Sequence, residues 1–161
     1  MGDEIELLRK TWESAMEKGD IATAKELVDK NIEMYLDEDT CVLLVAVSHG
    51  YLELCEWLIL QRHQPAGWYN RWGYTVLSEA CRNGYLAVCE LLLDHGAEVG
   101  GIGVNAPFTL AIQNGHTDIC KLLLQRGFKI NRRKRRELNE AKEGRYLNKI
   151  EKFIEKYGEA K

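Results

Sequence analysis

The fold is indicated most clearly by residues 70–97, NRWGYTVLSEACRNGYLAVCELLLDHGA. Two sets of apolar residues flank Gly84 with helical spacing: Leu77, Ala80 and Cys81 before it, and Val88, Leu91 and Leu92 after it. Apolar residues at i, i+3 and i+4 form one face of a helix. Glycine tolerates the positive φ with which a helix often ends. The stretch therefore predicts two short antiparallel helices joined at Gly84.

The same pattern recurs along the chain of 161 residues. The aligned glycines are Gly19, Gly50, Gly84 and Gly115, with a less exact match at Gly144. Four residues before each of the first four stands an alanine, which predicts a close helix–helix approach: Ala15, Ala46, Ala80 and Ala111. A period of this length is typical of a repeat array, in which each unit buries its apolar face against its neighbours. We expect one array over residues 1–161, with repeats at 7–37, 38–70, 70–100 and 101–131 and a C-terminal helical cap at 132–161.

Residues 70–97 resemble an ankyrin repeat nearly end to end. Ala106-Pro107-Phe108, Gly115-His116 and the segment from Leu122 to Gly127 are similar to the next repeat. The resemblance implies an all-α ankyrin-repeat solenoid of stacked helix pairs with hairpin-like fingers, which binds other proteins and does not catalyse. The family's Thr-Pro-Leu-His motif is replaced here, for example by Thr75-Val76-Leu77-Ser78. Since the histidine of that motif links helix to turn, we expect looser loops between the repeats.

Composition and charge indicate a soluble protein with unlike ends. The chain is 45% hydrophobic and 29% charged, with a net charge of −3, as in globular domains. Residues 1–40 carry 12 acidic and 5 basic side chains, whereas residues 126–161 carry 6 acidic and 13 basic ones. The acidic start, Met1 to Glu6, is unlike a signal peptide, and the apolar run from Cys41 to Val47 is too short to span a membrane. We expect a monomer in the cytoplasm or nucleus.

The cysteines and histidines predict no catalytic or metal site. Cys55, Cys89 and Cys120 recur once per repeat. Stacked helices lie about 10 Å apart, too far for one zinc ion with Zn–S bonds of about 2.3 Å, so the three are expected in the core. Cys41 and Cys81 are expected on the core face of first helices. None of the histidines belongs to a catalytic motif. No enzyme activity and no cofactor are therefore expected.

Aromatic residues suggest where a partner binds. Trp12 and Trp57 align with core leucines and are expected to be buried. Trp72 and Tyr74 fall where the family resemblance places a finger, and tryptophan, tyrosine and arginine dominate binding hot spots. Trp68 and Tyr69, in the same turn, either pack over the loop or bind. The predicted partner-binding residues are Ser48, His49, Arg71, Trp72, Tyr74, Arg82, Asn83, Asn105, Gln113 and Asn114.

A basic run forms the sharpest charge feature: Arg132, Arg133, Lys134, Arg135 and Arg136. It is compatible with a solvated loop, an acidic protein partner, or nucleic acid and nuclear import. Five adjacent cations reach few phosphates, and no aromatic residue interrupts the run for base stacking. The sequence therefore favours a protein-interaction module. The alternative is a nucleic-acid or nuclear-import-linked regulator that uses the basic run, and a third reading is an inhibitor that blocks an enzyme.

Overall fold

The computed structural model describes residues 2–30, 39–100, 105–129 and 144–157, and it divides into two compact units, Met1–Pro65 and Ala66–Lys161. Unit 1 contains α1 (Gly2–Lys18), α2 (Ile21–Asp29), α3 (Val42–Ser48) and α4 (Leu52–Leu60). Unit 2 contains α5 (Val76–Asn83), α6 (Leu86–Asp94), α7 (Pro107–Gln113), α8 (Thr117–Gln125) and α10 (Gly144–Tyr157). The predicted all-α repeat fold is confirmed. No described helix is long and apolar enough to cross a membrane.

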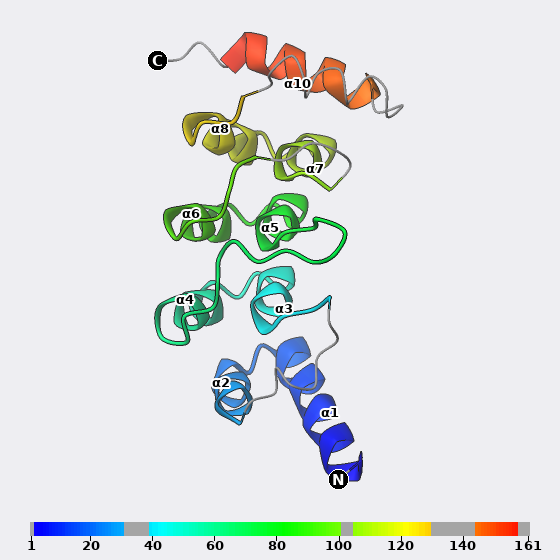
Figure 1. The fold of residues 1–161 in the computed structure, drawn as a ribbon, viewed down its shortest axis with the longest axis vertical. Coiled ribbons are helices and arrows are strands. Elements are labelled where there is room, and N and C mark those ends of the chain that lie inside the picture. The colour runs from blue at the N-terminus through cyan, green and yellow to red at the C-terminus, as the bar shows by residue number, and fades with distance from the viewer. Residues whose placement is uncertain (1, 31–38, 101–104, 130–143, 158–161) are drawn as a thin grey trace. The chain divides into compact units, whose positions relative to one another are not determined.

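Each repeat is an antiparallel helix pair: α1 with α2, α3 with α4, α5 with α6, and α7 with α8 (Figure 1). The four recurring glycines adopt positive φ values of 69°, 72°, 82° and 75°. The four recurring alanines are all buried, as the close helix approach requires. The first helix, α1, begins at Gly2, and the repeat bounds expected from the sequence stay a prediction.

Within unit 2 the pairs stack, because α5 packs on α7 and α6 on α8. Side chains fix this stacking. Ser78 is buried and its Oγ donates to the Asn105 carbonyl at 2.6 Å. Thr75 caps α5, with its Oγ1 accepting from the Ser78 N–H at 2.9 Å. The expectation of looser loops is therefore wrong at this position, since serine makes a helix-to-loop link in place of the family's histidine.

The residue after the recurring glycine also ties one repeat to the one before it. In unit 1 the Tyr51 hydroxyl donates to the Met16 carbonyl at 2.5 Å. In unit 2 the His116 Nε2 lies 3.1 Å from the Arg82 carbonyl. The His116 ring rests on Gly84, where a Cβ would come within 2.5 Å of it. Glycine at this position therefore serves both the turn and the contact with the next repeat.

The end of unit 2 is covered by α10, which packs on α7 (Figure 1). Phe108 is the centre of this contact: its ring stacks on Phe128 with centroids 4.2 Å apart and meets Phe153 of α10 edge-on at 6.1 Å. Ile150 is buried on the same helix. A C-terminal helical cap is therefore confirmed for residues 144–157. Gly144, aligned in the sequence with helix-ending glycines, instead begins α10.

Candidate protein-binding surface

A short hairpin precedes α5 and forms the finger of unit 2, residues 68–75. Tyr69 and Thr75 form an isolated antiparallel bridge. The Asn70 N–H donates to the Tyr74 carbonyl at 3.0 Å, and the Gly73 N–H donates to the Asn70 carbonyl at 2.9 Å. The Asn70 Oδ1 accepts from the N–H groups of Trp72 and Tyr74 at 3.1 and 3.0 Å. Gly73, with φ of 70°, closes the turn. Asparagine and glycine thus give the loop one fixed conformation.

This finger holds aromatic side chains out in solvent. Trp72 is 65% exposed and Tyr69 is 68% exposed. The Arg71 guanidinium carbon lies 5.0 Å from the centroid of the Trp72 ring, within cation–π range. Trp68 is half-buried, and its carbonyl accepts from the Val76 N–H at 3.3 Å. The sequence did not decide whether Trp68 and Tyr69 pack over the loop or are available to bind. In the structure Trp68 is partly packed, whereas Tyr69 is exposed to solvent.

Tyr74 lies behind the finger. It is half-buried, and its hydroxyl donates to Glu79 Oε2. Burial and this hydrogen bond raise the pKa of Tyr74 to about 12. Glu79 also accepts from Asn83 Nδ2 at 2.8 Å and lies 3.8 Å from an Arg82 nitrogen. Three of the predicted residues, Tyr74, Arg82 and Asn83, are thus brought together on Glu79.

Glu79 was not among the predicted residues. Its side chain is only 13% exposed, and it fixes the orientation of exposed Arg82 and Asn83. The i, i+4 spacing of Glu79 and Asn83 on one helix could have indicated this pair. The contact of Glu79 with Tyr74 arises because the finger folds back onto α5, and no local sequence pattern predicts this. We call Tyr69, Arg71, Trp72, Arg82 and Asn83 the finger surface.

The remaining predicted residues of unit 2 lie on the next repeat. Asn105 is exposed just before α7, and its carbonyl takes the Ser78 hydrogen bond. Gln113 is half-buried at the end of α7. Asn114 caps that helix end and donates from Nδ2 to the Leu110 carbonyl at 2.8 Å. Asn105 therefore lies at the start of α7, and Gln113 and Asn114 lie at its end. Arg82 and Asn83 lie at the end of α5, which packs on α7.

Ser48 and His49 belong to unit 1, at the end of α3. The Ser48 Oγ donates to the Val45 carbonyl at 2.8 Å, and the His49 Nδ1 lies 2.9 Å from the same oxygen. The His49 ring also stacks on Tyr51 at 5.4 Å. Beside it is a hollow of about 270 Å³ lined by Trp12, Glu13, Met16, Glu17, Val45 and His49. Both residues are thus held by their own repeat, next to an acidic hollow.

The prediction for the recurring cysteines is confirmed. Cys55, Cys89 and Cys120 are all buried, and all five cysteines are free thiols. Burial raises the pKa of Cys55 and of Cys120 to about 12, which disfavours the reactive thiolate. Among the described residues no group of three or more cysteine, histidine or acidic side chains could hold a metal ion.

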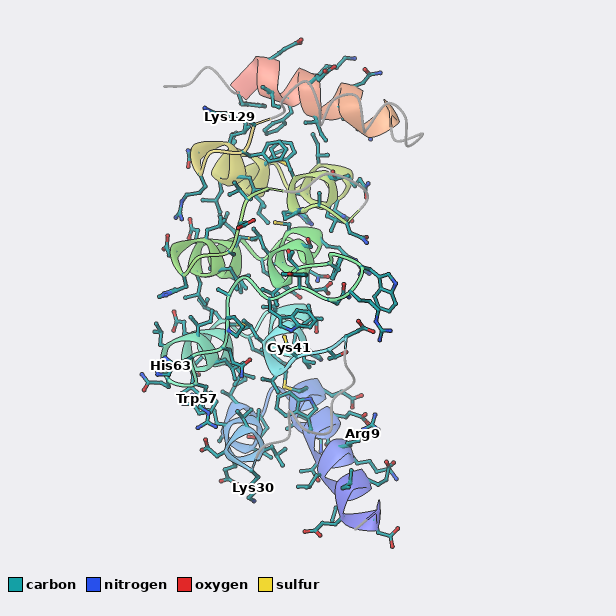
Figure 2. All side chains as sticks on the ribbon, viewed as in Figure 1. Arg9, Lys30, Cys41, Trp57, His63 and Lys129 are labelled. Atoms are coloured by element: carbon teal, nitrogen blue, oxygen red, sulfur yellow. The ribbon has the colours of Figure 1, made fainter. Side chains whose placement is uncertain are left out.

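Two of the predictions for core residues need correction. Cys41 does not lie on the core face of a helix, because α3 begins after it (Figure 2). Its backbone is extended, and its Sγ accepts from the Leu44 N–H at 3.3 Å. Trp57 is half-buried instead of buried, whereas Trp12 is in the core as predicted. Lys25 Nζ and the Arg62 guanidinium carbon lie 5.8 and 5.9 Å from the Trp57 ring centroid, because α4 presents this side chain at the surface.

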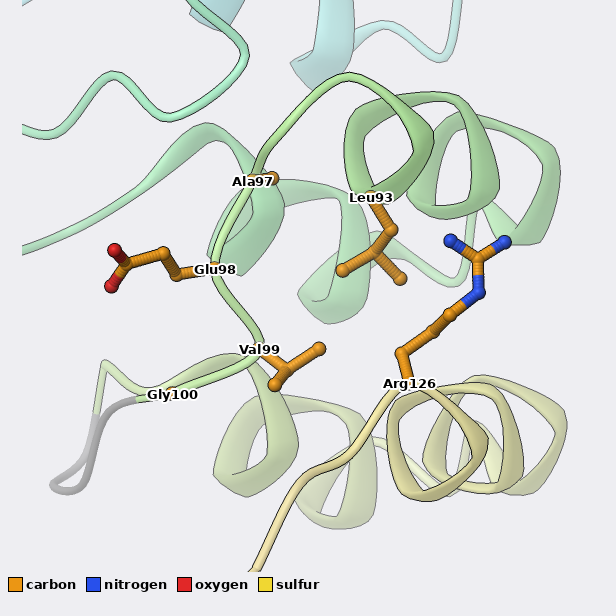
Figure 3. A pocket seen from close by; sticks show the side chains of 6 residues that line it. All are labelled: Leu93, Ala97, Glu98, Val99, Gly100 and Arg126. Carbon is orange, nitrogen blue, oxygen red and sulfur yellow. The ribbon is translucent and has the colours of Figure 1, made fainter.

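A second hollow, of about 430 Å³, lies in unit 2 between the ends of α6 and α8 (Figure 3). Leu93 and Val99 face the Arg126 side chain across it, and Glu98 points away. Arg126 is already paired with Asp94 at 2.7 Å. In unit 1 Arg62 pairs with Asp29 in the same way, at 3.3 Å. The hollow is therefore bounded by an ion pair of a kind that occurs in both units. Each of these ion pairs joins the second helix of one repeat to the second helix of the next, so it stabilises the stacking of the repeats.

The basic run Arg132, Arg133, Lys134, Arg135 and Arg136 lies outside the described residues, so its roles remain predictions.

Comparison with known proteins identifies the family of this chain. No curated protein matches the chain. A family model described as ankyrin repeats (3 copies) matches residues 12–102 and 43–134, which is most of the chain and reaches into all four helix pairs. The chain belongs to the ankyrin-repeat family.

Proposed function

We propose that this protein is a non-catalytic interaction module that binds a partner protein through the finger surface. One observation carries the proposal: Trp72 is 65% exposed on a loop whose conformation Asn70 fixes. Exposing a large aromatic side chain to water costs free energy. Tryptophan, tyrosine and arginine supply most hot spots at protein interfaces, and Tyr69 and Arg71 stand beside Trp72.

The mechanism is binding by a surface that is ordered in advance. Hydrogen bonds that the Asn70 side chain accepts order the finger, and Glu79 orders Arg82 and Asn83. Ordering an interface at the moment of binding costs about 0.5–1.5 kcal/mol for each flexible side chain. A surface that is already ordered avoids part of this cost. Tyr74 acts from behind the finger, and Asn105, Gln113, Asn114, Ser48 and His49 complete the proposed set.

The proposal extends to the domain organisation, the oligomeric state and the subcellular location of the protein. The repeat period continues in the sequence past Pro65, which supports one array over residues 1–161. Five free thiols support a reducing compartment, and hence the cytoplasm or nucleus. We propose a monomer. The alternatives are a nucleic-acid or nuclear-import-linked regulator that uses the run at 132–136, and an inhibitor that covers an enzyme's active site.

Site-specific photo-crosslinking tests the proposal. A photoreactive phenylalanine analogue is placed at Trp72, and in a second protein at Leu60, which is also exposed (48%) but lies on α4. In extracts of the source cells, we expect position 72 to capture a defined protein that position 60 does not. The same capture at both positions, or a nucleic acid at position 72, would refute binding through the finger.

A further inference from the structure

Two Asn-Gly pairs lie at the ends of first helices in unit 2. They are Asn83-Gly84 at the end of α5 and Asn114-Gly115 at the end of α7, and the sequence contains no other such pair. Asparagine followed by glycine is the sequence most prone to deamidation, because glycine lacks the Cβ that would hinder its backbone nitrogen from attacking the side-chain amide. Both pairs have the reactive sequence, so the surrounding structure decides which of them reacts.

The structure restrains the first pair. Asn83 is the last residue of α5, and its Nδ2 donates to the Glu79 carbonyl at 2.9 Å and to Glu79 Oε1 at 2.8 Å. The Gly84 N–H donates to the Ala80 carbonyl at 3.0 Å. Gly84 is half-buried, and the His116 ring rests on it. Reaction at Asn83 therefore requires several contacts to break, and the Glu79 carboxylate would repel the oxyanion that forms.

The second pair is less restrained. Asn114 lies beyond Gln113, the last residue of α7, and within the described part of the chain its Nδ2 makes one hydrogen bond, to the Leu110 carbonyl at 2.8 Å. The Gly115 N–H donates to the Ile112 carbonyl at 3.4 Å, which is long for such a bond. Asn114 and Gly115 are both exposed, and no described atom lies within 4 Å of an added Gly115 Cβ. The attacking nitrogen and the amide are thus weakly held and accessible to water.

We propose that Asn114 is a site of spontaneous deamidation in the folded protein. The Gly115 nitrogen loses its proton to water and attacks Cγ of Asn114. The bond between Cγ and Nδ2 then breaks and ammonia leaves, which gives a cyclic imide. Water opens the ring at either carbonyl, and the product is aspartate or, with an extra methylene in the backbone, isoaspartate. Water is the only co-reactant, and nothing is oxidised or reduced.

The product changes the helix end that carries Asn114. A neutral donor becomes a carboxylate, so the Leu110 carbonyl loses its hydrogen bond from Nδ2. The new charge lies at the C-terminal end of α7, where the helix dipole disfavours negative charge. Because Asn114 belongs to the proposed partner-binding set, deamidation also alters that set. The inference goes beyond the proposed function, since the reaction needs no partner.

Peptide mapping by mass spectrometry tests the proposal. The full chain is incubated at neutral pH, either folded or in urea, and the acid forms of the peptides that contain Asn83 and Asn114 are quantified over time. In urea we expect similar rates at the two residues, because glycine follows both. In the folded protein the additional hydrogen bond and the packed glycine should make Asn83 react about tenfold more slowly than Asn114.

Two variants test whether the local contacts cause this difference. Glu79→Ala removes the side-chain acceptor beside Asn83, and it should speed deamidation there severalfold without changing the rate at Asn114. Asn114→Gln should remove the product at that position, since glutamine would have to form a larger and less favoured ring. Circular dichroism verifies that each variant is folded.

Three results would overturn the inference. Equal rates at the two asparagines in the folded protein would mean that both react only through global unfolding. Reaction in urea alone would mean that the fold protects Asn114 as well. An unchanged rate at Asn83 in Glu79→Ala would mean that Glu79 does not provide the restraint. Loss of partner capture at Trp72 with the expected deamidation of Asn114 would refute the proposed function alone.

Discussion

Substitution of Gly84 by alanine tests how neighbouring repeats are joined. Gly84 has φ of 82°, and an added Cβ would lie 2.5, 2.8 and 3.0 Å from three atoms of the His116 ring. A left-handed conformation costs a residue with a Cβ about 1–2 kcal/mol. Displacing the ring also breaks its contact with the Arg82 carbonyl, and a hydrogen bond contributes about 0.5–1.5 kcal/mol. We therefore expect Gly84→Ala to lower the free energy of unfolding by about 2–3 kcal/mol.

Gly115 provides the control, because it has a similar φ of 75° but no atom within 4 Å of an added Cβ. Gly115→Ala should lower the free energy of unfolding only by the cost of the left-handed backbone conformation, about 1–2 kcal/mol. Urea unfolding followed by circular dichroism measures both variants. In a His116→Ala background, Gly84→Ala should cost about as much as Gly115→Ala, since the ring is gone. Equal costs for the two glycines in the presence of His116 would refute the reasoning.

Three further predictions follow from buried side chains. The fold raises the pKa of Tyr74 to about 12 from an ordinary value of about 10. The protonated Tyr74 hydroxyl therefore contributes its full stabilisation below about pH 10, and this contribution is lost as the pH rises through about 12. In urea titrations Tyr74→Phe should lose less stability than wild type over that pH range, and equal losses would contradict the assignment. Cys55, Cys89 and Cys120 should react slowly with a thiol reagent in the folded protein and rapidly in urea, whereas rapid labelling of all three under native conditions would contradict their burial. Phe128 stacks on Phe108 and is buried, so Phe128→Ala should cost about 3 kcal/mol in urea unfolding, and a cost below about 1 kcal/mol would show that the contact is weak.

Much of the fold could be predicted from the sequence because repeat packing depends on residue size. An alanine stands four residues before each glycine, and a cysteine stands five residues after three of the glycines. All of these residues are buried, as their equivalent positions in successive repeats predict. The glycines adopt positive φ because each ends the first helix of its pair. The alanine and the glycine recur in all four helix pairs and the cysteine in three of them, so each copy supports the interpretation of the others.

Two of the errors occur where one copy departs from the shared pattern, and the error at Cys41 has another origin. Cys41 stands nine residues before its glycine, and the residues aligned with it, Thr75 and Ala106, also precede their helices as N-caps. Trp57 is larger than the leucines of its column and extends toward Lys25 and Arg62. The Tyr74–Glu79 contact depends on how the finger folds back onto α5. Periodicity describes the average repeat, whereas these positions depend on individual contacts.

The central claim is that the exposed Trp72 side chain contributes binding energy for a partner protein. Isothermal titration calorimetry of the crosslinked partner against wild type, Trp72→Ala and Leu60→Ala tests it most directly. Truncation of a hot-spot aromatic residue costs about 2 kcal/mol or more, so Trp72→Ala should weaken binding by about thirtyfold. Its melting temperature should stay close to wild type, because the side chain is mostly exposed, and Leu60→Ala should bind like wild type. Unchanged affinity for folded Trp72→Ala would contradict the account.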